Sequence, residues 1–314
     1  MISLDDLAPW LAFAATAAAT PLLAHVALRW TWIDRRDGDL AERKPRTRPV
    51  ALVGGAALLL GLLAFQLASS AGSAPHLPWM ALVGAFLLGL VDDLKRGGLP
   101  ALGKFAGQVG VGVLLALEPG LEWHERILRG VLCVVAQNAV NTFDNADGAS
   151  TSLGLLACAP HAGARAVLLG FLPFNLLLGH GKGPKRVPLA YLGDSGSHLL
   201  GVLFAWLPGA EIALLLPLLD LARLVVVRWR AGQAPWLGDR RHLAHRLEAA
   251  GLSPLAVALA LVIIAAPPFL APELLAQALT PGSALALGVL ASLVLFSAAV
   301  RWTPNPKSAD ATSG

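Results

Sequence analysis

The sequence predicts an all-α integral membrane protein, a polytopic bundle of about eleven transmembrane helices. Two observations lead to this fold class. Of the 314 residues, 56% are hydrophobic and 14% are charged, with a mean hydropathy of +0.64. A soluble domain carries about 25% charged residues, so this chain has too few to cover a water-facing surface. Apolar runs near the roughly 17–25 residues that cross a bilayer recur along the chain, and lipid forces such runs into helices.

The first expected span begins after Asp5 and Asp6 and ends in a basic stretch, unlike a signal peptide, which starts basic and ends at a small-residue cleavage site. We therefore expect it to be retained. We expect residues 1–303 to form one transmembrane catalytic domain and 304–314 a short polar tail. The expected spans are 7–30, 50–69, 78–92, 103–117, 127–143, 149–162, 165–179, 197–208, 211–228, 253–271 and 284–301.

The basic residues sort by side once these spans alternate. All 24 Lys and Arg residues except Arg126, Arg129 and Arg165 fall on one side. Because basic residues favour the cytoplasmic loops, this side is expected to be cytoplasmic, with the N-terminus outside and the C-terminus inside. The net charge of +4 then suits anionic head groups or a phosphorylated substrate better than nucleic acid. Cys133 and Cys158 lie in apolar stretches without a CxxC pattern, so they indicate neither a metal nor a disulfide framework.

Acidic residues gather at the cytoplasmic ends of the spans. An ionisable group at membrane depth costs a few kcal/mol and is a functional candidate by default. A lone Asp at a helix end can also be a cap, and Asp220 can simply pair with Arg223. Two adjacent carboxylates repel each other unless a cation or a shared proton neutralises part of their charge. Mg²⁺ prefers one or two carboxylates plus substrate phosphates as ligands. The acids concerned are Asp92, Asp93, Asp144, Asp147, Asp194, Asp220 and Asp239.

Three basic side chains complete this set. Lys104 begins an apolar span, where a charge needs a partner. His242 and His245 are three residues apart, so they share one face if this segment is helical. No third ligand accompanies them for zinc, and phosphate contact or proton transfer is the favoured interpretation. Carboxylates, a lysine and histidines on one membrane face suit phosphate chemistry with a divalent metal.

The motifs resemble those of the polyprenyl-phosphate N-acetylhexosamine-1-phosphate transferase family, which includes the phospho-muramoyl-pentapeptide translocases. Each motif alone is weak, but six in the family's order between about Arg43 and Leu247 are specific. They are RK with GG (Arg43, Lys44, Gly54, Gly55), VDD with KFxGQ (Asp92, Asp93, Lys104, Gln108), NxxNxxDxxDG (Asn138, Asn141, Asp144, Asp147, Gly148), GFLxFN (Asn175), GDSGS (Asp194, Ser195, Gly196, Ser197) and PxxDxxR with DRxHLxHRL (Asp220, Arg223, Asp239, Arg240, His242, His245).

The resemblance implies an enzyme of a bacterial cytoplasmic membrane with ten or eleven spans. Such an enzyme joins a UDP-N-acetylhexosamine to a polyprenyl phosphate such as undecaprenyl phosphate and releases UMP. This is the first step of a lipid-linked cell-envelope glycan, with N-acetylglucosamine (GlcNAc) 1-phosphate the favoured group. The implied cofactor is Mg²⁺ or Mn²⁺. The implied partners include no nucleic acid, and a homodimer is left open.

The resemblance also implies roles for individual residues. Asp194 would bind Mg²⁺ with Asp93, and Asp92 would be the base on the lipid phosphate. The implied catalytic set is Asp92, Asp93, Asp144, Asp147, His242 and His245. The implied substrate-binding set is Lys104, Asn138, Asn141, Asn175, Asp239 and Arg240.

Departures from the family pattern concern the sugar. Asn145 replaces a glycine of the usual DGxDG, and Ala244 replaces the middle histidine of the usual HxHH. The second departure weighs against a phospho-MurNAc-pentapeptide transferase, which stays an alternative. A UbiA-like prenyltransferase or a CDP-alcohol phosphotransferase would need acid spacings that are missing here. A transporter using the acids as an ion path also stays open, although it predicts polar residues near the bilayer midplane.

Overall fold

A computed structural model describes residues 3–30, 33, 49–69, 76–180, 187–233 and 241–304, and all structural statements refer to these. The described chain is almost entirely helical, which confirms the predicted all-α class. The helices are α1 Leu4–Trp30, α3 Gly54–Ala68, α4 Trp79–Leu94, α5 Ala101–Ala116, α6 Trp123–Phe143, α7 Ala149–Ala157, α8 Ala162–Leu172, α9 Gly193–Trp206, α10 Leu215–Arg230, α11 Leu243–Ala249, α12 Pro254–Ala265, α13 Pro267–Leu274 and α14 Pro281–Trp302.

Short irregular elements join some of these helices. A single π-helical turn, Pro173–Leu177, extends α8, and a 3₁₀ turn, Ala210–Leu214, precedes α10. Strands β1 (Ala51–Leu52) and β4 (Ala190–Tyr191) pair in parallel, whereas β2 (Gly179–His180) and β3 (Val187–Pro188) pair antiparallel.

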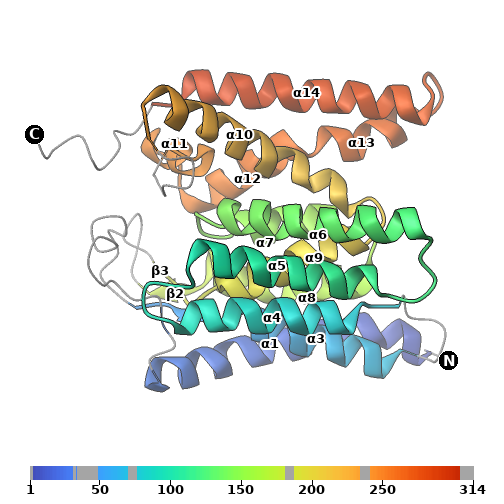
Figure 1. Cartoon of the computed structure of the whole chain (residues 1–314), viewed down its shortest axis with the longest axis vertical. Coiled ribbons are helices and arrows are strands. Elements are labelled where there is room, and N and C mark those ends of the chain that lie inside the picture. The colour runs from blue at the N-terminus through green and yellow to red at the C-terminus, as the bar shows by residue number, and fades with distance from the viewer. Residues whose placement is uncertain are drawn as a thin grey trace, which may run out of the picture.

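Helix α9 lies at the centre of the bundle. It packs against α3, α4 and α6, and every residue from Ser195 to Ala205 is buried. Around it, α1 packs on α3 and α8, and α5 packs on α4 and α6. Helix α14 packs on α13 at the far side of the molecule (Figure 1). The residues that begin α9 are therefore enclosed by several other helices.

Each of the eleven expected spans overlaps a described helix. By length and composition, α1 and α14 are each able to cross a membrane, and the pair α12–α13, bent by 48°, makes a third candidate among the described residues. The sixth expected span, 149–162, contains the short α7, which ends at Ala157. A helix usually ends before a proline, and Pro160 follows closely. The number of crossings stays a prediction.

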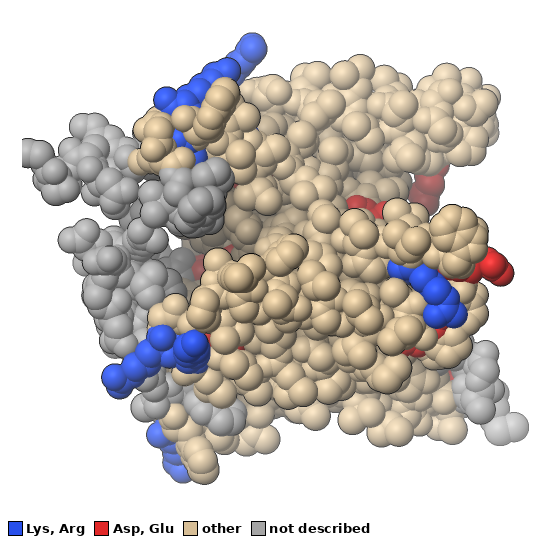
Figure 2. All heavy atoms as spheres, viewed as in Figure 1, with Lys and Arg blue, Asp and Glu red and all other residues tan. Residues whose placement is uncertain are grey.

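Helices α4, α5 and α6 run in alternating directions along the bundle. The connection from α4 to α5 lies at the left of Figure 1, and the connection from α5 to α6 lies at the right. Figure 2 shows most of the exposed Lys and Arg side chains of this face at the left end and one group at the right. This distribution agrees with the predicted sorting of basic residues, whereas the side that faces the cytoplasm stays a prediction.

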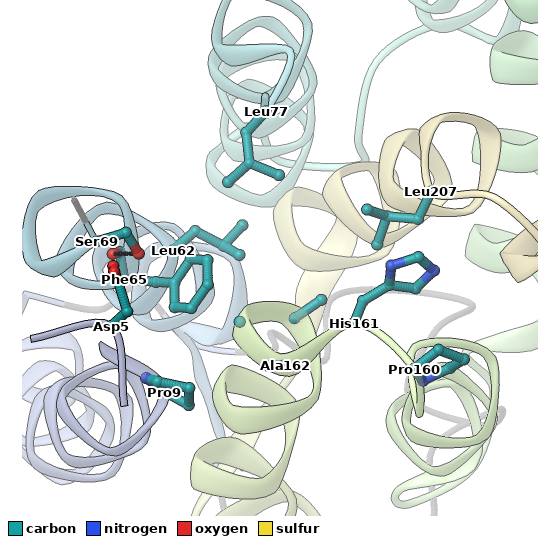
Figure 3. A pocket seen from close by; sticks show the side chains of 12 residues that line it. Asp5, Pro9, Leu62, Phe65, Ser69, Leu77, Pro160, His161, Ala162 and Leu207 are labelled. Atoms are coloured by element: carbon teal, nitrogen blue, oxygen red, sulfur yellow. Dashed lines mark hydrogen bonds between the residues drawn. The ribbon is translucent and has the colours of Figure 1, made fainter. Parts of the chain in front are cut away.

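A pocket of about 290 Å³ lies at the opposite end of α9 from its first residues (Figure 3). Its lining combines the apolar side chains of Leu62, Phe65 and Leu207 with His161. Since α9 has 14 residues, a rise of 1.5 Å per residue places this pocket roughly 20 Å from the start of the helix. It is therefore separate from the acidic residues described next.

Candidate active site

The Lys104 side chain joins residues from four helices. Its ammonium, in the first turn of α5, donates hydrogen bonds to Asp92 Oδ2 on α4 at 2.6 Å and to Asp194 Oδ2 on α9 at 2.5 Å. A third bond reaches Asn141 Oδ1 on α6 at 3.1 Å. The helix ends that the sequence predicts to share one face thus meet at a single cation. We call Asp92, Lys104, Asn141 and Asp194 the Lys104 cluster.

Further hydrogen bonds fix both carboxylates of this cluster. The other oxygen of Asp92 accepts from the backbone N–H of Leu99, in the connection between α4 and α5. Asn141 Nδ2 donates to Asp194 Oδ1 at 2.8 Å and to Ser197 Oγ at 2.9 Å. Asn141 therefore bonds to Lys104 through its oxygen and to Asp194 through its nitrogen, which holds the end of α6 against the beginning of α9.

Asp93 points away from its neighbour Asp92. Its carboxylate accepts from the backbone N–H groups of Asp194 at 2.9 Å and Ser195 at 3.0 Å. These are unpaired donors of the first turn of α9, so Asp93 caps that helix from α4. Within the described part of the chain, no three His, Cys, Asp or Glu side chains are grouped to hold a metal. The predicted role of Asp93 as a metal ligand stays a prediction.

Two glycines allow α4 and α9 to approach this closely. A Cβ atom at Gly89 would lie 2.3 Å from Ser195 N and 2.4 Å from Asp194 O. Gly193 has φ +72°, and a Cβ atom there would lie 2.8 Å from Asp93 Oδ2. Since any larger residue would separate the two helices or strain the backbone, both glycines are needed to bring Asp93 and Asp194 together.

A buried network of amide and histidine side chains is hydrogen-bonded to the backbone of Asp194. His198 Nδ1 lies 2.6 Å from the carbonyl of Asp194, and because a carbonyl only accepts, Nδ1 carries the proton. Nε2 then accepts from Gln108 Nε2 at 3.2 Å, and Gln108 Oε1 accepts from Asn138 Nδ2 at 2.6 Å. Asn138, predicted to bind substrate, thus uses its amide to tie α6 to α5. Sequence analysis did not single out His198, whose only signal is its place directly after GDSGS.

Asp144 and Asp147 lie in the connection between α6 and α7. Asp147 is buried. Burial is the largest cause that raises the pKa of Asp144 to about 8; a hydrogen bond with Ser150 opposes this, and the nearby negative charges of Asp194, Asp147 and Asp93 add to it. Burial therefore dominates the raised pKa of Asp144, and the contributions of Asp194, Asp147 and Asp93 show that several carboxyl groups lie near it.

His242 and His245 have different surroundings. His242 precedes α11 as its N-cap residue and is buried, with Nδ1 2.9 Å from Asp220 Oδ2. His245 lies within α11, with Nδ1 3.0 Å from Glu248 Oε2. Because His242 is outside the helix, the expectation of a shared helical face does not hold. Asp220 forms an ion pair with Arg223 at 2.8 Å, which is the structural role that the sequence offered for this acid, but it also binds His242.

The remaining predicted residues are not part of the Lys104 cluster. Asn175 is buried; its Oδ1 accepts from Thr151 Oγ1 at 2.8 Å, and its Nδ2 donates to the carbonyl of Ala190 at 3.1 Å. It thus links α7 to β4, and its role in binding substrate stays a prediction. Asp239 and Arg240 lie outside the described residues, as do Arg43 and Lys44 of the first motif.

Comparisons with known proteins identify relatives that are similar in sequence. No family model matches the chain. It is 28% identical over 283 residues to the decaprenyl-phosphate N-acetylglucosaminephosphotransferase of Mycobacterium leprae, covering 66% of this chain and 68% of the relative. A probable undecaprenyl-phosphate N-acetylglucosaminyl 1-phosphate transferase of Bacillus subtilis is 25% identical, covering 74% of each. The undecaprenyl-phosphate alpha-N-acetylglucosaminyl 1-phosphate transferase of Escherichia coli is 26% identical over 145 residues, covering 37% and 39%.

These matches and the six motifs agree. The helix ends that carry VDD, KFxGQ, NxxNxxD and GDSGS meet at the Lys104 cluster, although they are far apart in the sequence. Over about two thirds of its length, the chain is similar to curated polyprenyl-phosphate N-acetylglucosamine-1-phosphate transferases.

Proposed function

We propose that this chain transfers GlcNAc 1-phosphate from a UDP-sugar to a polyprenyl phosphate and releases UMP. The observation that carries the proposal is the Lys104 cluster, in which two carboxylates, an amide and an ammonium converge from four helices. The relatives are named for GlcNAc phosphate transfer to decaprenyl or undecaprenyl phosphate. These names favour GlcNAc over phospho-MurNAc-pentapeptide as the transferred group.

The oxygen atoms of the site suit Mg²⁺ or Mn²⁺. A hard cation takes carboxylate oxygens plus substrate phosphates, and Asp92 and Asp194 already share the Lys104 ammonium. Asp194, with Asp93 against its backbone, would hold the metal. When bound there, a divalent cation neutralises negative charge on the pyrophosphate of the donor.

The chemistry is a displacement at phosphorus. An oxygen of the lipid phosphate forms a bond to the β-phosphorus of the UDP-sugar, and the bond from that phosphorus to the bridging oxygen of UMP breaks. UMP leaves with the electron pair. Asp92 accepts the proton of a singly protonated lipid phosphate, and Lys104, within hydrogen-bond reach of Asp92, stabilises the charge on the phosphates.

The topology follows from the same proposal. Residues 1–303 form one domain that crosses the membrane eleven times, with 304–314 as a tail. The Lys104 cluster faces the cytoplasm, where a UDP-sugar is available, and the N-terminus lies outside. Arg29, Arg230 and Arg301, each in the last turn of its helix, support this orientation because they are at the ends of α1, α10 and α14 that such a topology places inside.

The test is UMP release by purified protein with Mg²⁺, undecaprenyl phosphate and a panel of UDP-sugars. We expect release with UDP-GlcNAc that requires both substrates, and at least a 100-fold loss in Asp194→Asn. Glu273→Gln, an exposed acid of α13, is the control that should keep wild-type activity. Wild-type turnover in a folded Asp194→Asn variant would refute the metal assignment. Uptake of a substrate into vesicles without chemistry would favour a transporter instead.

A further inference from the structure

Asp220 lies at the centre of a buried hydrogen-bond set between α10 and α11. Its side chain is almost fully buried, as is that of His242. Oδ2 receives His242 Nδ1 at 2.9 Å, and Oδ1 receives Arg223 Nη2 at 2.8 Å. The backbone N–H of Leu243 lies 3.2 Å from both oxygens. One carboxylate thus holds the ring of His242 and the backbone that follows it.

Arg223 extends this arrangement to the residue before His242. Besides its bond to Asp220, its guanidinium donates to the carbonyl of Arg241. A carboxylate on Nδ1 keeps the proton on that nitrogen and leaves Nε2 as the atom that contacts a ligand. Asp220 and Arg223 therefore fix both the position of residues 241–243 and the ring nitrogen that His242 presents.

A second set of bonds holds the other side of α11. Arg246 Nη2 donates to the carbonyls of Val300 at 2.5 Å and Thr303 at 2.6 Å, which ties α11 to the end of α14. His245 instead pairs with Glu248, one turn along the same helix. Within the described chain, His242 is hydrogen-bonded to a residue of another helix, whereas His245 is bonded to its own helix. A partner from another element fixes the orientation of a histidine ring.

We propose that Asp220 is a positioning residue of the transferase. It holds His242 with Nε2 directed to the sugar phosphate, and Arg223 supports it. This inference rests on the proposed function, because it needs His242 to contact substrate. It makes the PxxDxxR segment and the histidine loop one unit, although their partners are 22 positions apart in the chain.

A double-mutant cycle on kcat/KM for UMP release tests this role, with thermal unfolding recorded for each protein. We expect Asp220→Asn to lower kcat/KM about 10- to 100-fold and His242→Ala to lower it by at least as much. The double variant should match His242→Ala alone, because Asp220 acts through His242. The matched control is Glu248→Gln, which removes the negative charge beside His245 and should change kcat/KM less than threefold.

The outcomes separate the two proposals. No UMP release by the wild type would overturn the proposed function, and with it the role of Asp220. Normal wild-type release, with losses that multiply in the double variant, would overturn only the positioning role. If Asp220→Asn does not fold, Arg223→Gln replaces it: we expect a severalfold loss with His242 present and none in His242→Ala, and equal losses in both backgrounds would refute the proposal.

Discussion

Replacing Lys104 by methionine should destabilise the protein, and Mg²⁺ should restore part of the loss. The variant keeps an unbranched side chain but leaves Asp92 and Asp194 without their shared cation. Removing one partner of a buried ion pair costs about 3–5 kcal/mol. The Asp194 side chain is 32% exposed, so water partly replaces the lost contact and the lower value, about 3 kcal/mol, applies. At about 2–4 °C per kcal/mol, the unfolding temperature should fall by roughly 6–12 °C.

The assay is thermal unfolding in detergent, in EDTA and again in Mg²⁺. Because Lys104 and a divalent cation would both use the carboxylate of Asp194, Mg²⁺ should raise the unfolding temperature more in Lys104→Met than in the wild type. Lys95→Met is the control, since Lys95 is exposed in the connection after α4. An unchanged unfolding temperature in EDTA would refute the stabilising role of the ammonium. Equal Mg²⁺ shifts in both proteins would refute the shared site.

Two other predictions concern the close approach of α4 to α9 and the half-buried carboxyl of Asp144. Gly89→Ala should lower stability by about 1–3 kcal/mol and reduce UMP release strongly, because its Cβ atom meets the backbone of Asp194 and Ser195; Gly110→Ala, with no neighbour within 4 Å, should do neither. Wild-type stability should fall between pH 5 and pH 8, because Asp144 with its pKa raised to about 8 keeps a proton that the unfolded chain, with a pKa near 3.8, has lost. In EDTA, the stability gain of Asp144→Asn over the wild type should therefore grow across this window and level off above it, and a gain independent of pH would contradict the burial.

Much of the helical framework could be predicted from the sequence because lipid leaves few alternatives to an apolar helix. The exceptions are short. Helix α7 has nine residues where a longer span was expected, and hydropathy alone does not register the helix end before Pro160. The span at 253–271 is two helices with a bend, and Pro267 and Pro268 stand at that break.

The site could be predicted as a set of residues but not as a set of contacts. The partners of Lys104 are 12, 37 and 90 positions away, and no spacing in the sequence indicates which helix ends meet. Asp92 and Asp93 read as a pair, yet residues adjacent on a helix point about 100° apart. One therefore faces the ammonium and the other caps α9. The bond of Asp220 to His242 could not be predicted either, because the nearer Arg223 already explained that acid.

The charge of the Lys104 cluster explains why a metal should strengthen the binding of its phosphate-bearing substrates. With both carboxylates ionised, Asp92, Lys104 and Asp194 sum to one negative charge, which repels a phosphate. A divalent cation held by Asp194 changes the net charge to plus one, which attracts a phosphate. In Lys104→Met the net charge of the cluster becomes minus two without the metal and zero with it. UMP binding should therefore be weaker than in the wild type both in EDTA and in Mg²⁺. Calorimetric titration of UMP into both proteins measures this. Equal affinities in Mg²⁺ would mean that Lys104 orders the carboxylates without attracting the nucleotide.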